Sequence, residues 1–148
     1  MKGRGNSLVE ILMVEDSPSD VFLTQEALKQ TNESCRVHVV SDGVEAMEFL
    51  RKEGEYSKAP RPDIILLDLN MPRKDGREVL LEIKGDEKLK SIPVLVLTSS
   101  SAEQDIAKAY SLHANCYITK PVDFARFKEV INSIKTFWFG NVTLPPHE

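Results

Sequence analysis

The residues of this sequence that can do chemistry follow its most apolar segments. Four of five such segments end in them: Glu15 and Asp16 after the first, then Asp68, Thr98 and Lys120 after three others. Carboxylates at close quarters repel one another, which raises the pKa of one of them unless a cation lies among them. Oxygen ligands without histidine or cysteine suit Mg²⁺ and disfavour zinc and iron. Because a lysine and a hydroxyl can bind phosphoryl oxygens, the set predicts a Mg²⁺ site suited to phosphate chemistry.

Five short segments rich in Val, Ile and Leu must position these side chains as β-strands. They are residues 8–15, 35–40, 63–68, 94–99 and 115–120, and three of them are nearly continuous in apolar character. Such runs are typical of strands buried on both faces. Because segments with helical spacing alternate with them, we expect an α/β fold: a doubly wound, five-stranded parallel sheet with helices on both faces. Ligands of such sheets bind at the carboxyl ends of the strands, where these residues lie.

Two helices have clear sequence signals. The first is predicted to begin at "SPSD", with Ser17 as the cap, Pro18 in the first position and Asp20 completing a capping box. The last is predicted from about Asp123 to Phe137, with one apolar stripe that comprises Phe127, Val130, Ile131, Ile134, Phe137 and Trp138. A fourth helix is expected over about 102–111.

Length and composition indicate a single domain. The 148 residues suffice for one core, and 41% hydrophobic and 28% charged residues exclude a disordered chain. The net charge of −4 and the scattered lysines and arginines argue against nucleic-acid binding. No apolar run is long enough to span a membrane, so we expect a cytoplasmic protein. Cys35 and Cys116 fit neither a metal pair nor a disulfide framework and are expected to be small core residues.

Four motifs in order resemble the receiver domain of two-component response regulators, which includes the chemotaxis response regulator. They are "ED" after "ILMV", then "LLDLNMPRKDG", "VLVLTSS" and "YITKP". The resemblance implies that Asp68 is the phosphoacceptor and that Glu15 and Asp16 are the acidic pair of a Mg²⁺ site. It also implies that the main-chain carbonyl of Asn70 is a metal ligand, and that Thr98 and Lys120 bind the phosphoryl group.

The same resemblance assigns roles beyond the metal site. Thr98 and Tyr117 would form the conformational switch, and Asn70 and Ser100 would tune the lifetime of the phosphoryl group. The peptide bond before Pro121 would be cis, as is typical of the family.

The implied function is that of a signalling protein, not of an enzyme beyond self-phosphorylation from a phosphodonor and slow self-dephosphorylation. A histidine kinase would transfer a phosphoryl group to Asp68, and a conformational change would reach a protein partner through the fourth helix, the fifth strand and the fifth helix. The long loop before Pro62, "GREVLLEIK" and "FWFGNVTLP" resemble single-domain receivers that serve phytochrome-type histidine kinases.

The domain boundaries follow from the same motifs. We expect a flexible head over residues 1–7, one receiver domain over 8–138 and a tail over 139–148 that is too short for an output domain. The helical stripe accounts for Phe137 and Trp138 but leaves Phe139 and Leu144 without a core role. These aromatic and apolar residues either close the core of the domain or form a homodimer contact through the last helix and tail.

Three other functions stay open. An aspartate-nucleophile phosphatase needs a second aspartate two residues after the nucleophile, and Asn70 stands there. A flavodoxin-like cofactor binder needs a phosphate-binding loop after the first strand, where "EDSPSD" offers acids. A phosphorylation-independent adaptor is the third alternative, although all five site positions are filled.

Overall fold

The computed structural model of the protein describes residues 8–29 and 35–146, so the predicted head, residues 1–7, lies outside the described residues. One parallel sheet has the strand order β2-β1-β3-β4-β5. Its strands are β1 (Val9–Val14), β2 (Cys35–Val40), β3 (Ile64–Leu67), β4 (Val94–Thr98) and β5 (Cys116–Thr119). Each strand lies within its predicted segment, and the predicted doubly wound α/β fold is confirmed.

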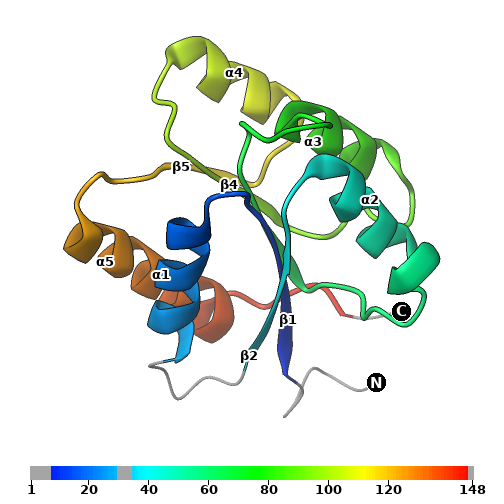
Figure 1. Ribbon diagram of the computed structural model, residues 1–148, viewed down its shortest axis with the longest axis horizontal. Helices are drawn as coiled ribbons and strands as arrows, with labels where there is room; N and C mark the ends of the chain where they lie inside the picture. The colour runs from blue at the N-terminus through cyan, green and yellow to red at the C-terminus, as the bar shows by residue number, and fades with distance from the viewer. Residues whose placement is uncertain (1–7, 30–34, 147–148) are drawn as a thin grey trace.

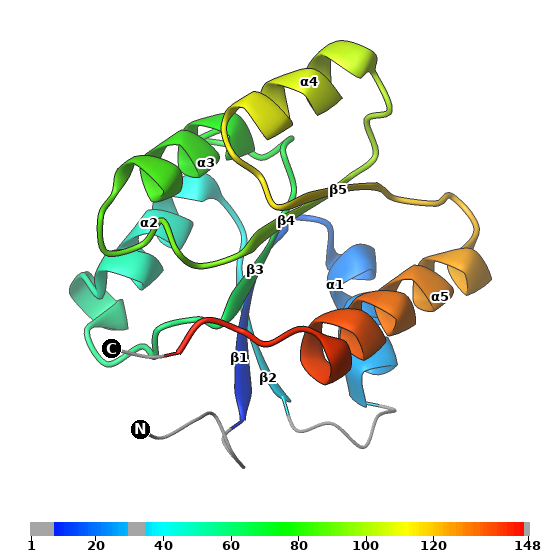
Figure 2. The ribbon, with the colours of Figure 1, turned by 180° about the vertical axis from the view of Figure 1, so that it is seen from behind.

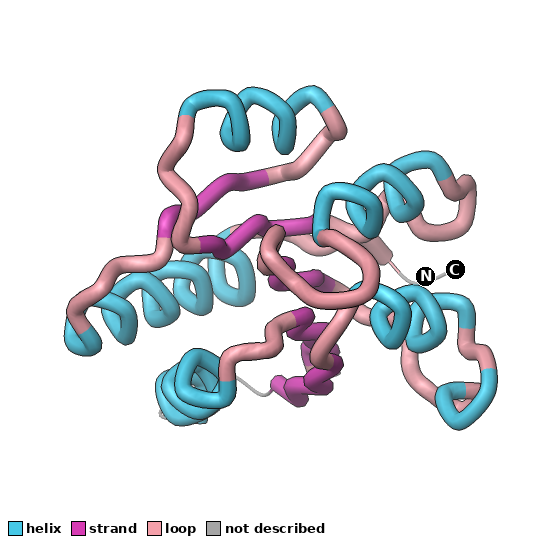
Figure 3. Tube along the Cα trace, turned by 45° about the horizontal axis from the view of Figure 1, so that its top comes forward, coloured by secondary structure: helices cyan, strands magenta, loops and turns pink. Residues whose placement is uncertain are grey.

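Helices cover both faces of this sheet (Figures 1 and 2). One face carries α1 (Pro18–Lys29) and α5 (Phe124–Ile134), and the other carries α2 (Gly43–Arg51), α3 (Gly76–Gly85) and α4 (Glu103–Ser111). Figure 3 shows the strands lying between these two layers of helix. No helix in the described ranges is long and apolar enough to cross a membrane.

Each central strand contributes alternate side chains to two separate cores. In β1, Leu12 and Val14 pack toward α2, α3 and α4, whereas Ile11 and Met13 pack toward α1 and α5. Strands β3 and β4 alternate in the same way. This double burial explains why their sequences are nearly continuous in apolar residues. Cys35 and Cys116 are half-buried and pack against the core on the α1 and α5 side.

The strand register brings the predicted site residues to one edge. Val14 lies opposite Leu67 in the β1–β3 pairing. Backbone bonds continue past the strand ends: the Asp68 amide donates to the Val14 carbonyl at 3.1 Å, and the Lys120 amide donates to the Thr98 carbonyl at 2.7 Å. The chain reverses its strand order between β1 and β3, which is where such sheets bind ligands.

The last helix differs from its prediction. Asp123 caps α5 by accepting from Ala125 N at 2.8 Å, but the α-helix ends at Ile134 and continues as a π-helix over Lys135–Asn141. The wider i to i+5 turn changes the angular spacing of the side chains. Phe137 therefore leaves the predicted apolar stripe and is 54% exposed.

The tail packs on its own chain, which is one of the two alternatives that the sequence left open. Phe139 packs against the core on the α1 and α5 side of the sheet, and Leu144 is only 5% exposed. Figure 2 shows the tail crossing from the α5 side of the sheet toward the α2 side. Phe139 and Leu144 therefore have a role in the core that the helical stripe could not assign to them.

The peptide bond between Lys120 and Pro121 is trans, and no peptide bond in the described residues is cis. The predicted cis bond before Pro121 is therefore wrong. Even before proline the trans form is favoured by about 0.5–1 kcal/mol. With this bond trans, Lys120 contacts Glu15 and Asp68.

Candidate functional site

Three carboxylates meet at the carboxyl ends of β1 and β3. One oxygen from each of Glu15, Asp16 and Asp68 lies within 4.8 Å of the others. Glu15 and Asp68 are buried and Asp16 is exposed, so the group opens to solvent on one side. The structure thus brings together the three acids that the sequence predicted as metal ligands.

Lys120 reaches this group from the end of β5. Its Nζ lies 2.6 Å from Glu15 Oε1, 2.8 Å from Asp20 Oδ2 and 3.4 Å from Asp68 Oδ2, and its side chain is 9% exposed. The ammonium thus contacts three carboxylates with its three donors. The structure places Lys120 beside the acids, as the sequence predicted, and Asp68 is the most distant of its three partners.

Asp20 is the residue of this cluster that sequence reasoning missed. It was expected to complete a capping box, yet only half of that box forms: Ser17 Oγ accepts from the Asp20 amide at 3.4 Å. The Ser17 amide donates to Glu15 Oε2 instead, at 3.1 Å, and the Asp20 carboxylate turns to Lys120. Its position in the first turn of the helix that directly follows the first strand is the signal that could have placed it at this edge.

The cluster holds more negative than positive charge, since it contains four carboxylates and one ammonium, which contacts three of them. Burial raises the pKa of Glu15 to about 7; the hydrogen bond from Lys120 opposes this shift, and the nearby Asp68 charge adds to it. Burial alone would lower the pKa of Lys120, but its bonds to Asp20 and Glu15 outweigh burial and raise it. Lys120 therefore stays charged, and the surplus negative charge falls on the acids.

Thr98 lies beside the acids at the end of β4. The residue is fully buried, and its Oγ1 has no hydrogen-bond partner among the described residues. A buried hydroxyl without a partner is costly, so such groups call for an explanation. A hydroxyl held at the site edge without a protein acceptor is suited to an incoming oxygen ligand.

Ser100, two residues after Thr98, is hydrogen-bonded to Tyr117 of β5. The Tyr117 hydroxyl donates to the Ser100 carbonyl at 2.8 Å, and the half-buried ring packs against the core on the α2, α3 and α4 side. Ser100 Oγ donates to Asp105 Oδ2 at 2.6 Å, so its hydroxyl is directed toward α4. The roles predicted for Thr98, Tyr117 and Ser100 stay predictions.

A second charged group, which we call the α3–α4 network, surrounds Ser100. It comprises Asp75, Arg77, Ser100 and Asp105. Arg77 donates to Asp75 Oδ1 at 3.0 Å and to Asp105 Oδ1 at 2.9 Å. The bonds from Ser100 and then Arg77 lower the pKa of Asp105. Every charge in this network has a partner.

The loop after Asp68 folds back over the Asp68 carboxylate. The amide of Asn70 donates to Asp68 Oδ1 at 3.2 Å, which holds the Asn70 backbone near the carboxylate. A Cβ at Gly76 would lie 2.4 Å from the Asp68 carbonyl oxygen, so only glycine fits where α3 begins. The predicted ligand position of Asn70 is thereby kept beside the three acids.

The donor set fits a hard divalent cation. It consists of oxygen atoms alone, two of the three carboxylates are buried, and the surplus charge is negative.

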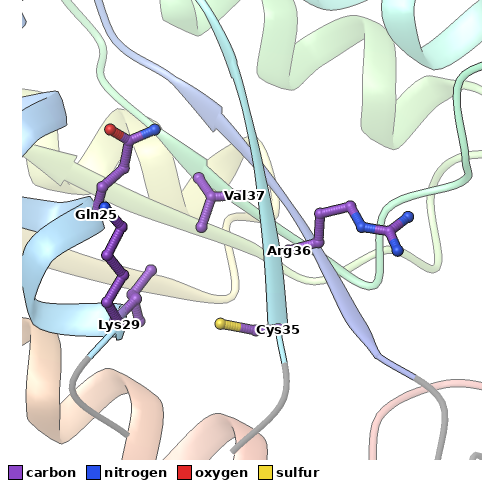
Figure 4. A pocket seen from close by; sticks show the side chains of 6 residues that line it. Gln25, Lys29, Cys35, Arg36 and Val37 are labelled. Atoms are coloured by element: carbon purple, nitrogen blue, oxygen red, sulfur yellow. The ribbon is translucent and has the colours of Figure 1, made fainter.

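A cavity of about 340 Å³ lies elsewhere, between α1 and the edge strand β2. Its lining residues include Gln25, Lys29, Cys35, Arg36 and Val37 (Figure 4). None of its lining residues is acidic, so the cation site and this cavity are separate features.

The family model of the response regulator receiver domain matches residues 11–132. The chain belongs to the response regulator receiver family. The curated response regulator Rcp1 of Synechocystis sp. is 48% identical over 145 residues, which cover 98% of this chain and 99% of Rcp1.

Solved receiver structures agree with this assignment. The phosphorylated cyanobacterial phytochrome response regulator RcpA has a TM-score of 0.92 and 51% identity, over 94% of this chain and 99% of RcpA. The Mn²⁺-bound form of Rcp1 has a TM-score of 0.90 and 49% identity, over 92% of this chain and 98% of Rcp1. The receiver resemblance predicted from the four motifs is confirmed, and one relative holds a divalent metal.

Proposed function

We propose that this response regulator receives a phosphoryl group on Asp68 from a histidine kinase and signals through the change that follows. The proposal rests on the groups that surround the Asp68 carboxylate. The carboxylate is oriented by the Asn70 amide and faces the Lys120 ammonium. It shares an edge with the Thr98 hydroxyl, which has no hydrogen-bond partner within residues 8–29 and 35–146. A nucleophile, a cation and a free donor are the parts that phosphoryl transfer requires.

In the transfer step an Asp68 oxygen attacks the phosphorus of a phosphohistidine. The new P–O bond forms as the P–N bond breaks, and the imidazole leaves with the electron pair. Lys120 then exchanges part of its contact with Glu15 and Asp20 for a phosphoryl oxygen, while Thr98 Oγ1 donates to another. Hydrolysis later breaks the P–O bond to Asp68 and releases inorganic phosphate.

Mg²⁺ is the cation that we propose for the site, held by Glu15, Asp16, Asp68 and the Asn70 carbonyl. When bound, it would neutralise charge that builds up on the phosphoryl oxygens. The oxygen donor set and the Mn²⁺-bound form of Rcp1 support a hard divalent ion.

Intact mass after incubation with acetyl phosphate and Mg²⁺ tests the phosphoacceptor. The parent should gain one phosphoryl group, and Asp68→Asn should gain none. Asp86→Asn is a matched control, because it makes the same change in a loop after α3, where the side chain accepts from the Lys88 amide. Equal labelling of the Asp68→Asn variant would refute the assignment. Failure of the parent to label would favour a phosphorylation-independent adaptor.

A phytochrome-type histidine kinase is the donor that we propose, because RcpA, a cyanobacterial phytochrome response regulator, matches nearly the whole chain. Transfer from a phosphorylated phytochrome-class kinase should be faster than transfer from a kinase of another class at equal concentration. Equal rates from both would refute this choice of donor.

A homodimer through the last helix and tail stays a prediction with a narrower basis. Leu144 and Phe139 are used within the chain, which leaves Phe137 as the exposed aromatic at the end of the last helix. Sedimentation of the parent and of Phe137→Ser, with and without a phosphoryl mimic, tests it. A parent that stays monomeric in both conditions would exclude the dimer.

A further inference from the structure

The loop that carries Asn70 is attached at its far end to a distant turn. Arg73 donates twice to the carboxylate of Asp42, from Nε to Oδ2 at 2.8 Å and from Nη2 to Oδ1 at 3.2 Å. Asp42 lies between β2 and α2, 31 residues earlier in the chain. Two parallel bonds between a guanidinium and a carboxylate fix orientation as well as distance.

The backbone at this attachment is in a conformation that needs support. Arg73 has φ of +64°, in the left-handed region that is unfavourable for a residue other than glycine. Such a conformation persists where neighbouring contacts impose it. Beside it, a Cβ at Gly43 would lie 2.3 Å from the Lys74 carbonyl oxygen, so the turn and the loop are in direct backbone contact.

We propose that Arg73 and Asp42 are positioning residues for the metal site. The pair fixes the loop three residues after Asn70, and the close contact between Gly43 and Lys74 prevents the loop from moving toward α2. A free loop would let the Asn70 carbonyl sample orientations away from the acids. Glu15, Asp16 and Asp68 would be unaffected, since they follow the ends of β1 and β3, where the Glu15 and Asp68 amides are bonded to neighbouring strands. The inference rests on the proposed Mg²⁺ site.

A purely structural role makes a different prediction. Arg73 is exposed over about half of its side chain, and exposed ion pairs contribute little to stability. The left-handed backbone offers a way to separate the two roles. Glycine adopts positive φ without cost, so Arg73→Gly removes the ion pair and the strain, whereas Arg73→Ala removes only the ion pair.

The experiment measures the Mg²⁺ dissociation constant by calorimetry and the melting temperature in EDTA for four variants. They are Arg73→Ala, Arg73→Gly, Asp42→Asn and the double variant Asp42→Asn with Arg73→Ala. Asp42→Asn keeps an oxygen that can accept from the Glu45 amide at the start of α2. We expect Mg²⁺ affinity to fall about three- to tenfold in each single variant, at or below the lower end of the range for groups that directly support a metal ligand.

Two features of the result decide the matter. Arg73→Gly should melt higher than Arg73→Ala and yet bind Mg²⁺ no better, and the double variant should bind no more weakly than Arg73→Ala, because both changes break one interaction. Affinities within twofold of the parent, additive losses, or affinity that recovers together with stability in Arg73→Gly would each overturn the positioning role. A parent that binds Mg²⁺ no better than Asp16→Asn would overturn the metal site itself and this inference with it.

Discussion

The acidic site and the α3–α4 network lie at the same edge of the sheet and treat charge in opposite ways. In the network the guanidinium of Arg77 lies between Asp75 and Asp105, and the pKa of Asp105 is lowered. In the acidic site Lys120 is shared among three carboxylates, and burial raises the pKa of Glu15 to about 7. Charge is paired in the network and left in surplus at the site where we propose that a cation binds.

The surplus negative charge of the acidic site is expected to lower the free energy of unfolding. Carboxylates that repel one another at close range reduce the stability of the folded chain unless a cation joins them. Sites that break the usual rules of stability are expected to be functional ones. Four variants test whether the acidic site is such a place and whether the network is not.

Replacing Lys120 should give the largest effect. Lys120→Met leaves Glu15, Asp20 and Asp68 without their cation, and uncompensated buried charge costs about 3–5 kcal/mol in other proteins. We expect the free energy of unfolding in EDTA at pH 8 to fall by about 2–4 kcal/mol. Urea titration measures it.

The matched control is Lys90→Met, because Lys90 pairs with Glu87 on an exposed surface and should change stability by less than about 1 kcal/mol. Added Mg²⁺ should recover part of the loss in Lys120→Met by linkage. A loss that is the same in EDTA, in Mg²⁺ and at pH 5 would show that Lys120 contributes packing and not charge balance.

The pH dependence of stability should give the next largest effect. Folding raises the pKa of Glu15 from its ordinary value of 4.5 to about 7, so the folded chain holds a proton that the unfolded chain has released. Stability in EDTA therefore falls as pH rises from about 4.5 to 7, by roughly 1–2 kcal/mol after allowance for solvent screening. Glu15→Gln should remove this slope.

Lys120 does not contribute to that window. Its pKa is raised by its acidic partners, so its stabilisation is fully present below its ordinary value of 10.5 and is lost only as pH rises through the raised value. Urea titrations from pH 4.5 to 8 with and without Glu15→Gln measure the difference. A slope that persists in Glu15→Gln would assign the titration to another group.

Sequence reasoning predicted the fold and the centre of the acidic site for a physical reason. Buried parallel strands require continuous apolar runs, and their carboxyl ends meet at one edge, so Glu15, Asp68 and Lys120 could be placed from the strand ends alone. The contact of Asp20 with Lys120 was not predicted, because a capping role already explained Asp20 locally. The Asp42–Arg73 pair was not predicted, because it joins two loops and no periodic sequence pattern relates one loop to another.

The same limit explains what went wrong at the carboxyl end of the chain. A stripe at 3.6-residue spacing predicted that Phe137 is buried, but the turn widens after Ile134 and exposes it. Leu144 could not be assigned to the core, since its burial depends on the path of an irregular tail.

Asp16 should show the cost of surplus charge most directly. Asp16→Asn removes an exposed carboxylate that lies beside two buried ones, so we expect stability in EDTA to rise by about 0.5–1 kcal/mol. The variant should also lose the stabilisation that Mg²⁺ gives the parent. Thermal unfolding in EDTA and in Mg²⁺ measures both. Lower stability in EDTA would show that Asp16 supports the fold, and the contrast between the two regions would then fail.

Asp105 should give the smallest effect, and its change should stay local. Asp105→Asn breaks the charged bonds to Arg77 and Ser100, but both partners are at least partly exposed and can turn to water. Ser100 Oγ also accepts from the Ala102 amide at 3.3 Å, directly before α4, whose cap residue Ala102 has no side-chain acceptor. We therefore expect faster hydrogen exchange of the Ala102, Asp105 and Ile106 amides with little change in melting temperature.

The matched control is Glu103→Gln, which alters an exposed acid in the same first turn and should leave exchange unchanged. A large fall in melting temperature, unlike the rise expected for Asp16→Asn, would mean that the paired network and not the strand edges holds this side of the molecule together.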